Sequence, residues 1–386
     1  MDSVGELRPP DRLLMGPGPS ETHPRVLGAF GTPPIGHLDP AFLDVMDDTQ
    51  QLLRGVFRTD NTWTIPVSGT GSAAMEAAIA NVVEPDDVML APSNGYFGDR
   101  MAEMARRAGG TVERVEAPWG EPLDPDAVAA ACADYDPDVI GVVHAETSTG
   151  VQRARSPTPS TTTARCSSPT VSPPSAASSS GLTSGVSTSP TAAPRSASPV
   201  RRAPARSRSE RMPSRRSANG RRQSGRGTST SRNWTTTGGR TAPTPVNNVY
   251  ALREALRLVR AEGIEARWAR HERYATALRD GLWALELEPV VEADARLPSL
   301  TTARLPAGLD PGPVVGRMRE AHEVEIATGL GAFAEEAVRV GCMGHGARRG
   351  PVLETLGALG ETLVDRGVDV APGDGVAAAV ASLNGA

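Results

Sequence analysis

The chain has 386 residues, enough for two domains with a large buried core. Its three cysteines are too few for the disulfide framework of a small secreted protein. No apolar run approaches the roughly 18 residues that a membrane span needs, and the first residues are polar and acidic. We therefore expect a cytoplasmic protein without a targeting signal or a membrane partner.

The charges are unevenly distributed along the chain. The formal net charge is −5, but residues 153–243 hold 16 arginines and one acid, Glu210, while the rest hold 24 arginines and 44 acids. All 40 basic residues are arginine, so the chain has no lysine. Acidic flanks suit a salt-rich cytoplasm, because salt screens the repulsion between like charges.

Residues 1–152 alternate between helical and strand patterns. Apolar residues at helical spacing predict helices over 40–58, 72–83, 98–107 and 124–135. Short apolar runs predict strands over 62–67, 88–91, 111–115 and 139–144. This alternation is typical of an α/β protein with a mostly parallel sheet.

Residues 153–243 have a different composition. Ser, Thr, Pro, Arg, Ala and Gly dominate, and the segment has no Phe, Tyr or Ile. Such a segment cannot bury enough apolar surface to offset a chain entropy of about 1–2 kcal/mol per residue. The printed sequence therefore predicts disorder or misfolding here.

The globular pattern returns from Pro245. Periodicity predicts helices over 247–261, 264–285, 312–322 and 350–366. Strands are expected over 300–305, 323–326 and 337–340, which together with these helices indicates an α+β domain.

Three short motifs lie where strands are expected to end. Ser68–Ser72 precedes a predicted helix, so its backbone N–H groups could bind an anion such as a phosphate, or it could be a plain capped helix start. Phe97 in Asn94–Gly98 could stack on a flat ring or pack in the core. His144–Gly150 places hydroxyls at the carboxyl edge of the sheet, where ligands bind in such folds, or forms a local turn.

Arg339 stands alone in an apolar strand. A buried guanidinium needs an anionic partner, which could be a bound carboxylate or an internal salt bridge. Cys342, Met343 and His345 nearby lack the spacing of metal ligands and are expected to pack, so no metal site is predicted.

The order and spacing of these motifs carry a resemblance that none of them carries alone. The segments are Met15–Ser20, Gly36–Pro40, Ser68–Glu76, Asn94–Gly98, Glu146–Val151, Pro245–Leu252 and Arg339–Gly344. Together they resemble the class V pyridoxal-phosphate-dependent aminotransferases, in the branch that holds the alanine–glyoxylate, serine–glyoxylate and serine–pyruvate enzymes. The resemblance implies the type I fold of these transferases, with an N-terminal arm (1–25), a large cofactor-binding domain (26–260) and a small domain (261–386).

The same resemblance implies a function and a set of site residues. Pyridoxal 5'-phosphate would be the cofactor, and the substrates would be a small amino acid and a 2-oxo acid. Thr70, Gly71 and Ser72 would hold the phosphate, Phe97 would stack on the ring, and Thr147 would hydrogen-bond the cofactor. Arg339 would bind the substrate carboxylate. Gly36 would contact the substrate and Thr244 the cofactor. Both lie in segments that often reach the partner subunit's site, so a homodimer is expected.

The family's two central residues, an aspartate beside the pyridine ring and the lysine that holds the cofactor as an imine, fall where this chain turns Arg/Ser-rich. Reading the codons one base earlier permits the family's patterns there. The codons around Trp234 and Thr235 then give Leu-Asp whichever synonymous codons are used. With third bases chosen to suit, a lysine codon falls at Ser196 within G-S-Q-K, and an aspartate codon falls at Thr170. We infer two compensating frameshifts, near residues 153 and 244.

We therefore expect the gene to be that of an aminotransferase and the printed chain to be inactive. An alternative is an inactive transferase fold with an Arg/Ser-rich insert that binds nucleic acid, although the missing aromatic residues argue against base stacking. A cysteine desulfurase is disfavoured, because no cysteine lies in a suitable loop.

Overall fold

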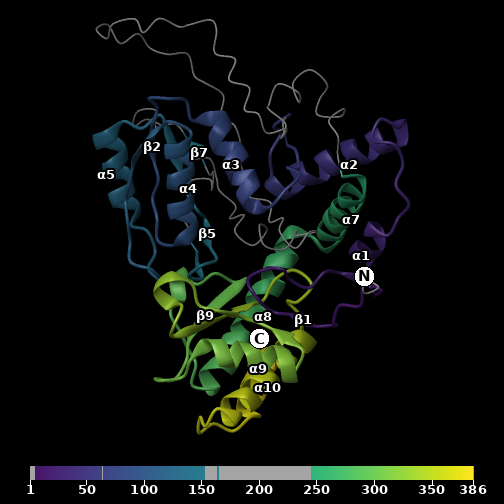
Figure 1. Cartoon of the computed structure of the whole chain (residues 1–386), viewed down its shortest axis with the longest axis vertical. Helices are drawn as coiled ribbons and strands as arrows, with labels where there is room; N and C mark the ends of the chain where they lie inside the picture. Colours follow the sequence, from purple (N-terminus) through teal and green to yellow (C-terminus); the bar gives the residue numbers. More distant parts are fainter. Residues whose placement is uncertain (1–4, 63, 153–162, 165–244, 386) are drawn as a thin grey trace, which may run out of the picture.

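The computed structural model of the chain describes residues 5–62, 64–152, 163–164 (backbone only) and 245–385 (Figure 1). The predicted disorder of 153–243 falls outside these residues, apart from the backbone of 163–164. The positions Thr170, Ser196 and Thr244 also lie outside the described part of the chain.

The N-terminal half contains a four-stranded sheet in the order β3-β2-β4-β7. Its strands are Thr111–Glu113, Val88–Leu90, Val139–Gly141 and Thr163–Ala164. The two pairings of β2 are parallel, with Leu90 opposite both Glu113 and Ile140, whereas β7 runs antiparallel to β4. The predicted α/β class with a mostly parallel sheet is thus confirmed.

Three helices pack around this sheet: α3 (Gly71–Val82), α4 (Tyr96–Arg107) and α5 (Pro125–Tyr135). The α3 helix begins after Thr70, whose hydroxyl accepts from the Ala73 N–H at 3.2 Å, and α5 begins at a proline that follows the capping Asp124. A core of buried side chains from α3, α4 and the sheet fixes these helices on it; its members include Met75, Ile79, Met89, Met101 and Val139.

Helices α1 (Pro24–Phe30), α2 (Pro40–Phe57) and α7 (Val246–Glu262) pack together beside that sheet and share their own apolar cluster (Figure 1). The α2 helix begins as predicted, because Asp39 accepts from the Ala41 N–H at 2.9 Å and Pro40 fits the first helical turn. This packing brings the segment that follows residue 244 back onto the N-terminal helices.

The C-terminal half is built on an antiparallel sheet in the order β11-β12-β9-β8. Its strands are Ala327–Thr328, Ala337–Gly341, Leu300–Arg304 and Glu288–Pro289. Helices α8 (Ile264–Ala284), α9 (Pro311–Ala321), α10 (Arg349–Asp365) and α11 (Asp374–Gly385) accompany it. These elements share a large apolar core, which confirms the α+β prediction and places Cys342 among packed side chains.

The N-terminal arm joins this C-terminal half. Strand β1 (Leu13–Leu14) pairs in parallel with β10 (Val324–Glu325), and the Gly341 N–H donates to the Met15 carbonyl at 2.7 Å. The arm therefore lies against the end of β12, the strand that carries Arg339.

Some predictions of local structure are wrong. Residues 64–67 form no strand, because a strand exists only through a partner and none of the described residues pairs with them; Pro66 also lacks a donor. The strand predicted over 139–144 stops at Gly141, and the chain continues into a hairpin of β5 (Ala145–Glu146) and β6 (Val151–Gln152). Helices α1 and α11 were not predicted from the sequence.

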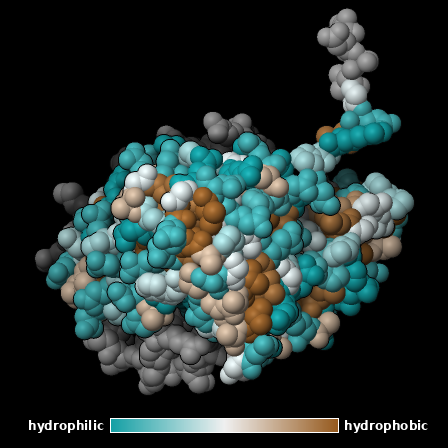
Figure 2. Space-filling model, turned by 90° about the horizontal axis from the view of Figure 1, so that it is seen from below, coloured by the Kyte–Doolittle hydropathy of each residue, from teal (hydrophilic) through white to brown (hydrophobic). Residues whose placement is uncertain are grey.

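The surface of the C-terminal half is mainly polar. Figure 2 shows a largely hydrophilic face with several separate apolar areas, as is normal for a protein surface. Among the described helices, none has the length and apolarity that crossing a bilayer would require.

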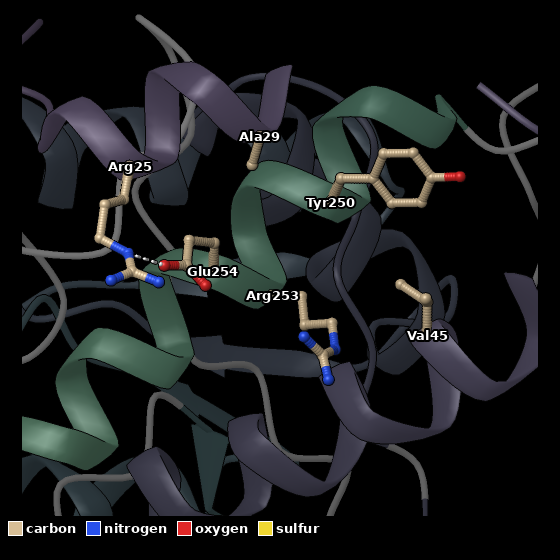
Figure 3. Close-up of a pocket in the computed structure, with 6 residues that line it drawn as sticks. All are labelled: Arg25, Ala29, Val45, Tyr250, Arg253 and Glu254. Atoms are coloured by element: carbon tan, nitrogen blue, oxygen red, sulfur yellow. Dashed lines mark hydrogen bonds and ion pairs between the residues drawn. The ribbon is translucent and has the colours of Figure 1, made fainter. Parts of the chain in front are cut away.

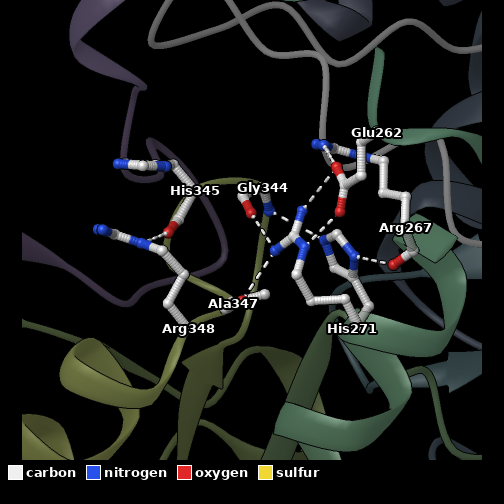
Figure 4. Close-up of polar contacts among 8 residues, drawn as sticks. Glu262, Arg267, His271, Gly344, His345, Ala347 and Arg348 are labelled. Carbon is white, nitrogen blue, oxygen red and sulfur yellow. Dashed lines mark hydrogen bonds and ion pairs between the residues drawn. The ribbon is translucent and has the colours of Figure 1, made fainter. Parts of the chain in front are cut away.

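A buried histidine links α8 to the turn after β12 (Figure 4). His271 is 1% exposed. Its Nε2 accepts from the Gly344 N–H at 3.1 Å, and its Nδ1 lies 2.7 Å from the Arg267 carbonyl. Only a neutral ring with its hydrogen on Nδ1 satisfies both contacts. Burial accordingly lowers the pKa of His271 to about 4.

This contact predicts acid sensitivity. Below pH 6.5, the ordinary pKa, the unfolded chain binds a proton at His271. The folded chain does not bind this proton until the pH falls to about 4. As the pH falls from 6.5 to about 4, the free energy of unfolding should therefore decrease by about 3 kcal/mol in total. Above pH 6.5 His271 is neutral in both states, so none of this stability is lost. When urea unfolding is measured across this pH range, the free energy of unfolding of His271→Gln should depend less steeply on pH than that of the parent.

The control for this experiment is His37→Gln, in the loop before α2, which removes one histidine and leaves the contact between His271 and Gly344 in place. Part of the slope should remain in both variants, because burial also lowers the pKa of His345 to about 4. Equal slopes in the parent and His271→Gln would contradict the prediction.

Candidate functional site

Two loops meet at the carboxyl edge of the N-terminal sheet. Residues 93–98 follow β2, and residues 144–150 follow β4. The Tyr96 N–H, at the start of α4, donates to the Ser148 hydroxyl at 3.0 Å. Because β2 and β4 are parallel neighbours, their following loops emerge side by side, as in other folds that bind ligands at this edge.

Glu146 holds the two loops together. One carboxylate oxygen accepts from the N–H groups of Phe97 and Gly98, at 3.1 and 3.3 Å. The other accepts from the N–H and the hydroxyl of Ser148, at 3.1 and 2.7 Å. Burial raises the pKa of Glu146, while these hydrogen bonds oppose the rise. This role of Glu146 was not predicted from the sequence, although an acid closing an apolar strand was a usable signal.

The close approach of the loops requires a glycine at position 95. A Cβ there would lie 2.6 Å from the Glu146 Cγ and 2.6 Å from the Ser148 Oγ. Gly95→Ala should therefore push the loops apart and lower the melting temperature by roughly 2–6 °C. Gly28→Ala on α1, where a Cβ meets nothing within 4 Å, is the matched control for differential scanning calorimetry. Equal melting temperatures for both variants would refute this account.

Arg339 reaches the second of these loops from the C-terminal sheet. Its Nη1 donates to the Thr147 carbonyl at 3.1 Å, and its Nε donates to the Thr328 carbonyl at 2.9 Å. Burial lowers the pKa of Arg339, and the charge of Glu146 opposes that change. Among the described residues no carboxylate forms an ion pair with Arg339, so the internal salt bridge finds no support there and the guanidinium can still bind an anion.

The N-terminus of α3 presents unused donors. Thr70 caps the helix through Ala73, but within the described chain no acceptor is found for the N–H groups of Gly71 and Ser72. The preceding Gly69 has φ +149°, and residues 68–70 are exposed. Free N–H groups and the positive end of the helix dipole are together suited to an anion.

The remaining predicted residues are placed less clearly. The ring of Phe97 is half-buried against the core under α3 and α4 and makes an edge contact with Tyr96, with centroids 5.3 Å apart. Gly36 is exposed in the loop between α1 and α2. The structure thus brings Phe97, Thr147 and Arg339 to one region.

One cavity lies away from these residues. It has a volume of about 400 Å³ and lies between α1, α2 and α7 (Figure 3). Its charged groups are already paired, since Arg25 donates to Glu254 at 2.9 Å and Arg253 pairs with Asp48. Arg257 and Arg25 lower the pKa of Glu254 to about 2. This cavity contains none of the predicted site residues, whereas a smaller one of about 190 Å³ adjoins Ser93, Gly95 and Asp99 at the start of α4.

Comparison with known proteins gives relatives along nearly the whole chain. The (S)-ureidoglycine–glyoxylate transaminase of Bacillus subtilis is 30% identical, over 98% of this chain and 97% of its own. The alanine–glyoxylate aminotransferase of Mus musculus is 32% identical, over 92% of this chain and 88% of its own. No model of a protein family matches the chain.

Among solved structures, the similar proteins are again glyoxylate aminotransferases. The alanine–glyoxylate aminotransferase of Nostoc sp. superposes with a TM-score of 0.76 at 34% identity, covering 94% of this chain and 97% of that one. The ureidoglycine–glyoxylate aminotransferase of Bacillus subtilis gives 0.75 at 26% identity, covering 98% and 100%.

Proposed function

The chain belongs to the class V pyridoxal-phosphate-dependent aminotransferases of fold type I, and on that basis we propose that its gene encodes an enzyme that moves an amino group from a small amino acid to glyoxylate or pyruvate. Pyridoxal phosphate is the cofactor of this family, and amino acids and 2-oxo acids are its substrates. Glyoxylate is the favoured acceptor, because the relatives named above share it while their donors differ. Serine, alanine and (S)-ureidoglycine are the donors to be tested.

The observation that supports this proposal is a pair of positions, one on each half of the chain, whose N–H donors find no anionic partner among the described residues. The N–H groups of Gly71 and Ser72, which find no acceptor in the described chain, would hold the cofactor's phosphate, with Thr70 beside them. Arg339, without a carboxylate partner in the described chain, would bind the substrate's carboxylate through its fork.

The other assignments complete the proposed site. Phe97 would stack on the cofactor's ring, and Thr147, from the loop that Arg339 contacts, would hydrogen-bond the cofactor. Gly36 and Thr244 would reach the site of a partner subunit. We therefore propose a cytoplasmic homodimer in which residues 26–260 form the cofactor-binding domain.

The residues present fit the anionic groups of the cofactor but not its covalent attachment. That attachment needs a lysine amine, and the chain contains no lysine. We propose that residues 153–243 are read out of frame, that the shifted codons at Ser196 and Thr170 encode the missing lysine and aspartate, and that the printed chain is inactive.

Resequencing the locus across codons 150–245 tests the frame directly. Two compensating single-base differences, together with cellular peptides that match the shifted frame, would support the proposal. Confirmation of every base, with peptides that match the Arg/Ser-rich text, would overturn it.

A second candidate function rests on the charge of this segment, with 16 arginines against one acid in 153–243. The printed chain would then be an inactive transferase fold that binds nucleic acid through its insert. Such binding should weaken steeply with salt, so gel-shift assays at two salt concentrations separate the two candidates.

A further inference from the structure

Helix α4 begins without a cap of its own. Gly95 at the N-cap position offers no side chain, so the first N–H groups of the helix need acceptors from elsewhere. They find them in the loop after β4: the Tyr96 N–H donates to the Ser148 hydroxyl, and the N–H groups of Phe97 and Gly98 donate to Glu146. A distant segment therefore caps this helix.

The acceptor has the chemistry of a bound anion. Glu146 is 1% exposed, and each of its two oxygens receives two donors. An amide of the same shape could not reproduce this set, because its NH₂ group would face N–H donors. The positive end of α4 favours a negative charge at this point.

We propose that Glu146 is a positioning residue: its carboxylate replaces a ligand anion at the N-terminus of α4 and fixes the segments that carry Phe97 and Thr147 relative to each other. Phe97 donates directly to this carboxylate, and Thr147 is its chain neighbour, held from the other side by Arg339. Of the helix ends at α3 and α4, that of α3 is the one whose first N–H groups find no acceptor among the described residues, so it remains the candidate for an external anion. The consequence for the cofactor rests on the proposed function, whereas the bracing of the two loops does not.

Two variants of the full chain test the proposal without cofactor or substrate. Glu146→Gln keeps the volume and loses the charge, and Glu146→Ala removes both. Each should lower the melting temperature by roughly 2–6 °C and speed hydrogen exchange at the amides of residues 96–98. Glu103→Gln, an exposed acid later on α4, controls for the loss of one charge and should leave both readouts near the parent's.

Chemical rescue separates a built-in anion from a packing role. Sodium formate should raise the melting temperature of Glu146→Ala and restore the protection of the amides of residues 96–98 from hydrogen exchange. Relative to sodium chloride at the same concentration, this gain should be larger in Glu146→Ala than in the parent. Glu146→Gln should show no extra stabilisation by formate, because its amide fills the space.

Parent-like stability and protection in Glu146→Gln, or equal gains from formate in all proteins, would overturn the proposal. Should Glu146→Ala fail to fold, the comparison of Glu146→Gln with Glu103→Gln decides. None of these outcomes depends on transamination.

Discussion

The protein made from the gene with its frame restored over 153–243 is expected to transaminate a small amino acid with glyoxylate, and the printed chain is expected to be inactive. A lysine amine both holds the cofactor and moves the proton of the substrate in this family, and proton transfer alone contributes about 10²–10⁴-fold to a rate. Activities should therefore differ by at least this factor. The measurement is formation of glycine from glyoxylate with serine, alanine or (S)-ureidoglycine as donor, each protein supplied with pyridoxal phosphate.

Two controls define what the restored frame contributes. Ser196→Lys in the printed chain supplies the amine without the surrounding segment and should stay inactive. Replacing the lysine of the restored protein by alanine should abolish activity and also the borohydride-stable attachment of the cofactor that mass spectrometry detects. Transamination by the printed chain at an ordinary turnover of about 1–10³ s⁻¹ would contradict the lysine argument.

The periodicity of the sequence predicted most of the described helices and the parallel sheet, because these elements bury regular apolar faces. Helix α2 and strand β2 illustrate this, since caps and apolar spacing alone place them. The strand predicted over 62–67 was wrong for the opposite reason. Its apolar pattern was adequate, but a strand also needs a neighbour, which periodicity does not identify.

The site was predictable only in part. The residues that follow strands β2 and β4 were expected at the sheet edge, because parallel topology alone places them there. Glu146 and His271 were not found, since the role of each depends on a backbone donor far away in sequence: Glu146 bonds Phe97, and His271 bonds Gly344. An acid at the end of an apolar strand marks Glu146 as unusual, but the local sequence does not identify its distant partner.

In the protein with its frame restored, Arg339→Ala is expected to lower kcat/KM by about 10²–10³-fold, because a half-buried fork that binds a carboxylate contributes several kcal/mol. Most of the loss should appear in KM, since the carboxylate is bound equally in the ground and transition states. Arg339→Lys keeps the charge but loses the two parallel hydrogen bonds, so its kcat/KM should lie between those of the parent and Arg339→Ala.

Arg304→Ala is the matched control, because Arg304 lies on the neighbouring strand β9 and pairs with Glu336 at 3.1 Å on the surface. It should change kcat/KM little. A second comparison uses an amine donor without a carboxylate, ethanolamine, against serine. If Arg339 binds the substrate's carboxylate, Arg339→Ala should lose activity toward serine far more than toward ethanolamine. Equal losses for both donors would instead mean that Arg339 supports the loop at Thr147 without contacting the substrate.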